Sequence, residues 1–315
     1  MKKNKNTNRK KILILIILLI ITLTTGCTKT LVDKNKKAVI NKQTGQNLTA
    51  NILCKPTAKE TIKQYKKNKV NIDKLPDCEN FKINSGKYEG LWTTILVKPL
   101  AYVILQLGKL TKNYALALVL ITIIIRLISY PFTKKAAMQS ELMKKAQPEM
   151  QKIQKKYAGK QDEESMMKQS QEMMMIYKKY NISPLAGCLF SFIQLPLFIA
   201  FYEAVQRFPA IFEDQFIGIQ LGTTPSVGIT TSTFYIYIII MLLISLTTIY
   251  SFKMNMSGQT LDPTMKNMPI YMSIMIIITA LFMPSALCIY WIVNNLCTIL
   301  QNRIVKKHID QLKRS

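Results

Sequence analysis

The sequence predicts an all-α polytopic membrane protein with five transmembrane helices. Hydrophobic residues make up 49% of the 315 residues, and they gather in long runs instead of recurring at the spacing of a soluble core. Almost all of the charge, a formal net value of +26, falls between those runs. Because an α-helix satisfies its own backbone hydrogen bonds in lipid, runs of about 20 apolar residues indicate helical spans.

The first 26 residues have the composition of a secretion signal. Lysine and arginine precede a 14-residue apolar stretch at 12–25, which is short for a transmembrane span. The stretch ends in LTTGC, which resembles the lipobox of bacterial lipoproteins. That resemblance implies cleavage of a signal peptide, residues 1–26, and lipidation of Cys27, with palmitate among the acyl groups. Thr24 departs from the leucine usual in the motif, and an uncleaved signal anchor is the alternative.

Residues 27–88 form a polar, lysine-rich region without a sustained apolar period. This composition predicts a small, loosely ordered region outside the membrane. Cys54 and Cys78 fall in this region, where an oxidising compartment would allow them to form a disulfide. The remaining cysteines after Cys27 fall in apolar runs, where a thiol packs as a small hydrophobic group.

Residues 89–108 are apolar, but Lys98 and Pro99 interrupt them. Proline lacks a backbone donor, so a helical break is expected at this point. Trp92 and Tyr102 suit a boundary between membrane and water. The segment is therefore predicted to be an amphipathic helix on the outer leaflet, and a sixth span is the alternative.

Residues 109–303 contain the predicted five-helix core. The last apolar run, of roughly 36 residues, would be about 54 Å long as one helix, which exceeds a bilayer core of about 30 Å. The sequence Met283-Pro284-Ser285 therefore marks a turn between two spans. The five spans are predicted at about 113–132, 184–206, 233–252, 268–283 and 285–303.

The loops between the spans set the predicted orientation. Residues 133–180 carry eleven lysines, whereas 207–232 carries one arginine and two acidic residues. By the positive-inside rule, 133–180 and the basic tail 304–315 are cytoplasmic, and 207–232 is outside. Five spans then put 28–112 outside, in agreement with the lipobox. The fourteen lysines of 28–90 disagree, but long segments translocate largely regardless of charge.

Residues 134–180 are predicted to form a cytoplasmic helical hairpin. Both halves are rich in helix formers, Gly159 supplies the break between them, and Asp162 can cap the second helix. The methionines give soft apolar faces, which either pack the two helices together or bind apolar segments of other proteins. These methionines are Met138, Met143, Met150, Met166, Met167, Met173, Met174 and Met175.

Arg126 lies inside the first span, with twelve uncharged residues before it and six after. A guanidinium stays charged, and its insertion at the centre of a span costs about 2.5–3.5 kcal/mol. Arg126 is about 9 Å from the end of the span, so a long side chain could reach the headgroups. The alternatives are a functional charge and a snorkelling side chain. Glu203 is the only other charge well inside a predicted span.

The sequence lacks the constellations that catalysis or cofactor binding requires. The single histidine, His308, lies in the basic tail, and there are no paired carboxylates, no Walker loop and no metal-ligand cluster. No enzymatic activity, cofactor or metal is therefore expected. A small-anion transporter is the alternative function, because an intramembrane arginine can bind an anion, but no repeated halves with broken helices are found.

Four stretches carry a resemblance to a known family: IIIRLISYPFTKKAAMQSELM, AQPEMQKIQKKY, PLAGCLFSFIQLPLFIAFYEAV and MPSALCIYWIVNNLCTILQN. With the lipobox they cover roughly 200 residues, and in the same order they resemble the Oxa/YidC/Alb membrane protein insertases, specifically the lipoprotein-type YidC of Gram-positive bacteria. The resemblance implies five helices around a hydrophilic groove that opens to the cytoplasm and to lipid. It also implies a protein of the bacterial cell membrane that inserts nascent membrane proteins and helps them fold. The Sec translocon and the ribosome are further candidate partners.

By position in these stretches, the resemblance makes Arg126, Gln194 and Trp291 residues of the substrate groove. Gln194 could instead hold two helices together by hydrogen bonds, and Trp291 could simply pack in the bundle. Asn294 and Asn295 are two further polar residues of the last span that are expected to face the interior.

Two further features limit the resemblance. The sequence Tyr250-Ser251-Phe252 departs from the glutamine often found at that place, so no groove residue is predicted there. The basic tail suits ribosomal RNA or anionic lipid equally well, without a specific nucleic-acid site.

Overall fold

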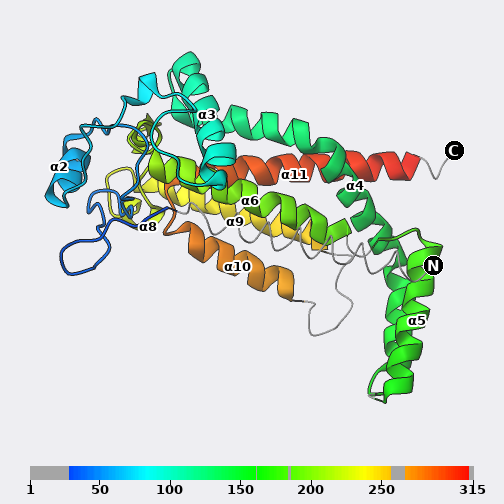
Figure 1. The fold of residues 1–315 in the computed structure, drawn as a ribbon. Coiled ribbons are helices and arrows are strands. Elements are labelled where there is room, and N and C mark those ends of the chain that lie inside the picture. The colour runs from blue at the N-terminus through cyan, green and yellow to red at the C-terminus, as the bar shows by residue number, and fades with distance from the viewer. Residues whose placement is uncertain (1–27, 161, 184–185, 257–266, 312–315) are drawn as a thin grey trace. The chain divides into compact units, whose positions relative to one another are not determined.

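The computed structural model describes residues 28–160, 162–183, 186–256 and 267–311 (Figure 1). The predicted signal peptide and the lipidation site Cys27 lie outside the described residues. The described chain is mostly helical, and it divides into two compact units. The first unit comprises Met1–Ile121, Pro196–Phe234 and Phe282–Leu287, and the second comprises Thr122–Leu195, Tyr235–Leu281 and Cys288–Ser315.

Residues 28–90, predicted to be loosely ordered and outside the membrane, have a core of their own, so the prediction of loose order is wrong. They contain α2 (Lys59–Lys67), a short 3₁₀ turn (Cys78–Asn80) and isolated β-bridges such as Thr30 with Thr49. The apolar residues are spaced irregularly along the chain and meet only through these long-range contacts. The buried cluster consists of Leu31, Val39, Leu48, Ile52, Tyr65 and Ile72.

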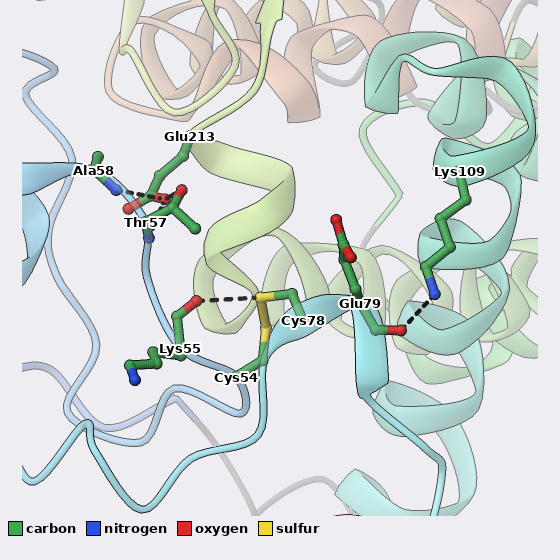
Figure 2. The surroundings of a disulfide bond; sticks show 8 residues. All are labelled: Cys54, Lys55, Thr57, Ala58, Cys78, Glu79, Lys109 and Glu213. Atoms are coloured by element: carbon green, nitrogen blue, oxygen red, sulfur yellow. Dashed lines mark hydrogen bonds between the residues drawn. A yellow bond between two sulfur atoms is a disulfide. The ribbon is translucent and has the colours of Figure 1, made fainter.

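A disulfide closes this region, as Figure 2 shows. Cys54 and Cys78 are bonded, with their Cα atoms 4.9 Å apart, and both are buried. Nearby, Glu213 Oε2 accepts hydrogen bonds from the backbone N–H of Thr57 at 2.8 Å and of Ala58 at 3.1 Å. A carboxylate at the N-terminus of α2 is favoured by the helix dipole. The loop that contains Glu213 therefore fixes the start of α2.

The expected break at Pro99 is a change of helix geometry and not an end of the helix. A wide π-helical turn at Thr93–Val97 leads directly into α3 (Lys98–Thr111), where Pro99 occupies the first turn. A π-helical turn lets a helix continue past the hydrogen bond that proline cannot donate. Trp92 is buried in a cluster with Val97 and Ala200, and its place at the membrane–water boundary stays a prediction.

Each of the five predicted spans contains a helix in the described part of the chain. They correspond to α4 (Tyr114–Tyr157), α6 (Ala186–Arg207), α9 (Phe234–Met256), α10 (Met268–Ala280) and α11 (Ser285–Gln311). The predicted turn between the last two spans is confirmed. In the described part of the chain, Thr93–Thr111, Tyr114–Tyr157 and Phe234–Asn255 are long and apolar enough to cross a membrane, and Ile270–Ala280 is a shorter apolar helix. The number of spans therefore stays a prediction.

The loop between α6 and α9 has little regular structure. It contains the short helices α7 (Pro209–Phe212) and α8 (Pro225–Gly228) and a two-stranded hairpin of β1 (Gln215–Phe216) and β2 (Ile219–Gln220). Residues 28–90 pack against this loop in the first unit. Thr224 N–H donates to Thr44 O at 2.7 Å, and a Cβ on Gly45 would lie only 2.3 Å from Thr224 Oγ1.

The two helices of the predicted hairpin are present, with one difference in the first arm, and the cytoplasmic location of the hairpin stays a prediction. The first arm continues the preceding span without a break, so that α4 has 44 residues and includes Pro131 and Pro148. Gly159 adopts φ +81°, and Asp162 caps α5 (Glu163–Lys179) by accepting from Ser165 N–H at 2.8 Å. Some of the methionines are packed and others are exposed. Met143, Met150 and Met173 pack between the arms, whereas Met166, Met167, Met174 and Met175 are exposed.

Two carboxylates join the arms of the hairpin. Glu149 accepts from Lys179 Nζ at 2.7 Å and from Tyr180 Oη at 2.7 Å, and these hydrogen bonds lower the pKa of Glu149. Glu172 accepts from Lys156 Nζ at 2.5 Å and from Tyr157 Oη at 2.9 Å, and its pKa is lowered for the same reason. A lowered pKa in the folded hairpin means that the carboxylates stabilise it only while ionised.

We expect acid to loosen the hairpin slightly. The contribution is fully present above the pKa of an unfolded glutamate, about 4.3, and is lost as the pH falls through the lower folded values. The effect is small because both ion pairs are exposed to solvent. Spin labels at residues 151 and 171 should give a broader distance distribution at pH 3 than at pH 7. The double variant Glu149→Gln/Glu172→Gln should give a broad distance distribution at both pH values. Identical narrow distributions for the parent and the variant at both pH values would contradict this expectation.

A polar site around Arg126

Arg126, on α4 in the second unit, is held by α11. Its Nε donates to Asn294 Oδ1 at 2.8 Å, and its Nη2 donates to Thr298 Oγ1 at 2.8 Å and to Asn294 O at 3.2 Å. The side chain is only 8% exposed. A snorkelling side chain would extend along its own helix toward the headgroups. The observed guanidinium instead lies against a neighbouring helix.

Gln194, on α6, reaches the same part of α11. Its Nε2 donates to Tyr290 Oη at 2.8 Å and to Asn294 Oδ1 at 3.4 Å. Asn294 Oδ1 is therefore an acceptor shared by Arg126 and Gln194. Residues 290, 294 and 298 are spaced by four, so they lie along one face of the helix. This arrangement brings together two of the three predicted groove residues.

Trp291 directly follows Tyr290 on α11. It is partly buried, and one residue after Tyr290 it points about 100° away around the helix. Its assignment to a substrate groove stays a prediction.

Two site residues, Tyr290 and Thr298, were missed by the sequence prediction. The signal was present, because polar or hydroxyl-bearing residues recur every fourth position in an otherwise apolar run. Such spacing indicates a polar stripe on one side of a buried helix. Asn294 was expected to face the interior, and this is confirmed by its contacts with Arg126 and Gln194.

The chemistry of the site is that of a cation held by neutral dipoles. The acceptors described for Arg126 are an amide oxygen, a backbone carbonyl and a hydroxyl, which solvate the guanidinium without carrying an opposite charge. Five donors in a fixed fork make arginine well suited to binding a carboxylate. The described residues contain no cluster of potential metal ligands.

A second polar seam joins α9 to α11. Asn295 Nδ2 donates to Thr248 Oγ1 at 3.0 Å, and Asn302 Nδ2 donates to Asn255 Oδ1 at 2.7 Å. These side chains satisfy one another between two helices, as expected of polar residues that hold a membrane bundle together. Ser251 belongs to the stretch that departs from the glutamine often found in the family, and it is buried beside this seam.

Glu203, the second charge predicted inside a span, has a different environment in the first unit. Trp92 Nε1 donates to Glu203 Oε1 at 2.8 Å, and Arg207 Nη1 lies 3.4 Å from Glu203 Oε2. Arg207 is fully buried and also binds Glu89 and the backbone oxygen of Asn51. This closed network is satisfied internally, so it is structural.

Comparisons with known proteins agree with the architecture. Residues 106–312 match the family described as 60Kd inner membrane protein. The membrane protein insertase MisCA of Bacillus subtilis is 37% identical over 217 residues, a match that covers 68% of this chain and 79% of that protein. The membrane protein insertase YidC of Oceanobacillus iheyensis is 34% identical over 220 residues, covering 70% of this chain and 85% of that protein.

A solved structure shows the same fold. It is the crystal structure of an active YidC insertase with its first transmembrane domain resolved, with a TM-score of 0.50 and 22% identity. The match covers 76% of this chain, which spans about half of that chain, 52%. On the family match and on the relatives, the chain belongs to the 60Kd inner membrane protein family, the family of the YidC membrane protein insertases.

Proposed function

We propose that this multi-pass membrane protein inserts nascent membrane proteins into the bacterial cell membrane and helps them fold. Membership of the insertase family supports the activity. The single observation that carries the mechanism is the buried guanidinium of Arg126 held by neutral acceptors on α11. The comparisons give no support to the alternative, a small-anion transporter.

The proposed role of Arg126 is to attract acidic segments that must cross the membrane. One aspartate at the centre of a span costs about 2.5–3.5 kcal/mol. Opposite charges 4 Å apart attract by about 4 kcal/mol at an effective dielectric of about 20. The attraction therefore offsets the cost of about one carboxylate. In a hydrophilic groove, which the resemblance implies, water would reduce both the cost of the carboxylate and its attraction to Arg126.

The neighbouring polar groups would keep this charge in place. Asn294 and Thr298 bind two different nitrogens of the guanidinium, and Gln194 binds the same amide oxygen of Asn294. A charge that is already oriented needs little reorganisation when a client arrives. Release needs no nucleotide or covalent step, because burial of the client's apolar span in lipid drives it. Trp291 is proposed as an apolar wall of the same groove.

Reconstitution in liposomes tests the function directly. Purified full-length protein should insert a short client with an acidic translocated tail, measured by protection of that tail from external protease. The same vesicles should show no flux of small anions above that of empty vesicles. Anion flux without client protection would overturn the proposal in favour of a transporter.

We also propose that a lipid anchors the protein at Cys27, which supports an extracytoplasmic location of residues 28–112 and a cytoplasmic tail 304–315. Cys27→Ser should abolish incorporation of labelled palmitate and leave a larger precursor. Insertion activity should largely survive, because the spans already hold the protein in the membrane. A parent chain without label, of the same mobility as the variant, would show that the signal anchor is retained.

A further inference from the structure

The extracytoplasmic region carries an excess of positive charge on its surface. Residues 28–90 contain fourteen lysines and six carboxylates, a formal charge of +8. All of these lysines except Lys55 are exposed. None of them forms an ion pair with a carboxylate in the described part of the chain. A region of this size that keeps such a charge repels itself and attracts anions.

Three of the six carboxylates of the region are engaged in local structure. Asp33 accepts from the backbone N–H groups of Asn35 and Lys37 in a tight turn. Glu60 accepts from Gln64 on α2, and Glu89 binds Arg207. These contacts hold acidic side chains close to the backbone or in the buried network. They leave the lysine charge on the surface to be balanced from outside.

The same unit continues into an apolar surface. The helix that follows residue 90 buries one face and exposes Leu91, Ile95 and Leu110, the last with 79% of its surface accessible. Tyr88, 69% exposed, lies between the lysine-rich region and this helix. Exposed aliphatic and aromatic side chains next to lysines are typical of a surface that rests on lipid headgroups. A soluble polyanion would not explain the apolar part.

The lysines are carried on a fixed scaffold and not on a tether. Leu53 N–H donates to Arg207 O at 2.9 Å, and Arg207 Nε donates to Asn51 O at 2.9 Å. Gln46 Nε2 donates to Gln206 Oε1 at 2.9 Å. These bonds tie residues 46–53 to the end of α6, which is predicted to span the membrane. The lysine surface is thereby held next to the lipid bilayer.

We infer that the lysines of residues 28–90 bind the phosphate headgroups of anionic phospholipids in the adjacent leaflet. In the predicted topology this is the outer leaflet. The bound phosphates neutralise the region and orient the first unit on the membrane surface. The inference adds a lipid-binding surface to the proposed insertase and does not depend on the role of Arg126.

Lysine acetylation in nanodiscs tests this inference with the full-length protein. Zwitterionic nanodiscs are compared with nanodiscs that also contain phosphatidylglycerol, and mass spectrometry measures the acetylation rate at each lysine. At low salt, phosphatidylglycerol should slow acetylation several-fold at a group of lysines in 28–90. About 1 M salt, where the Debye length is about 3 Å, should restore the rates.

A matched pair of variants separates this surface from charge in general. Lys59, Lys63, Lys66 and Lys67 lie on the exposed side of α2, whose buried side chains Thr61 and Tyr65 are left unchanged. Replacing these four lysines by glutamine should weaken the protection of the remaining lysines in 28–90. Lys306→Gln/Lys307→Gln, in the basic tail, should leave that protection as it is in the parent.

Two results would overturn the inference. One is equal acetylation of every lysine of 28–90 in the two kinds of nanodisc. The other is equal protection in zwitterionic nanodiscs when soluble poly(glycerol phosphate) is added, which would identify a soluble polyanion as the ligand. Because client insertion is not measured, neither result bears on the proposed function.

Discussion

Arg207→Ala should destabilise the first unit by about 3–5 kcal/mol, the range found when one partner of a buried ion pair is removed. Arg207 is fully buried, and the substitution leaves the Glu203 carboxylate, 1% exposed, without its cation. It also removes the donors to Asn51 O and Thr93 Oγ1. The midpoint of thermal unfolding in nanodiscs should fall by several degrees, and residues 28–90 should become sensitive to protease.

Two further variants separate charge from geometry at this network. Arg207→Lys keeps a cation but cannot reach Asn51, Thr93 and both glutamates at once, so it should be intermediate. Arg207→Ala/Glu203→Gln should be more stable than Arg207→Ala alone, because a neutral amide is cheaper to bury than an unpaired carboxylate. If Arg207→Ala and the parent had the same midpoint of thermal unfolding, the network would contribute no net stability.

Arg126→Ala should reduce insertion of clients with acidic translocated tails by a large factor. The upper limit is set by about 4 kcal/mol for one carboxylate, and hydration of the site lowers it. Clients in which Asn and Gln replace the tail carboxylates should be inserted almost as well as by the parent. Protection of the tail from external protease, with equal amounts of folded variant in each vesicle preparation, measures both.

The conservative substitution distinguishes a charge from a scaffold. Arg126→Lys keeps a positive charge but loses the planar fork that binds Asn294 and Thr298 together. Much of the preference for acidic clients should remain. Equal loss of acidic and neutral clients in Arg126→Ala would instead mean that Arg126 holds α4 to α11 and has no electrostatic role.

The helical architecture could be predicted because apolar runs report directly on membrane spans. The continuity of α4 through Pro131 and Pro148 could not, because proline usually breaks a helix and the local sequence alone does not show where it is tolerated. The core of residues 28–90 was missed for a different reason. Residues such as Leu31, Leu48 and Ile72 have no period and meet only through long-range contacts and a disulfide that spans 24 residues.

Part of the polar site around Arg126 could also be predicted from the sequence. Arg126 was identified because a single charge in an apolar run must be compensated. Its partner Thr298 is uncharged and gives no signal by itself. Only the four-residue spacing of polar residues on α11 could have indicated it. Arg207 was assigned to an outside loop, although it lies four residues after Glu203 and pairs with it on α6.

Reversal of the charge at residue 126 tests the central claim most directly. Three matched clients, with acidic, neutral and basic translocated tails, are presented to liposomes that contain the parent or Arg126→Glu, and insertion is expressed relative to the neutral client. We expect the parent to prefer the acidic client and Arg126→Glu to prefer the basic one. An unchanged order of preference, with insertion of the neutral client intact, would contradict an electrostatic role of Arg126 in insertion.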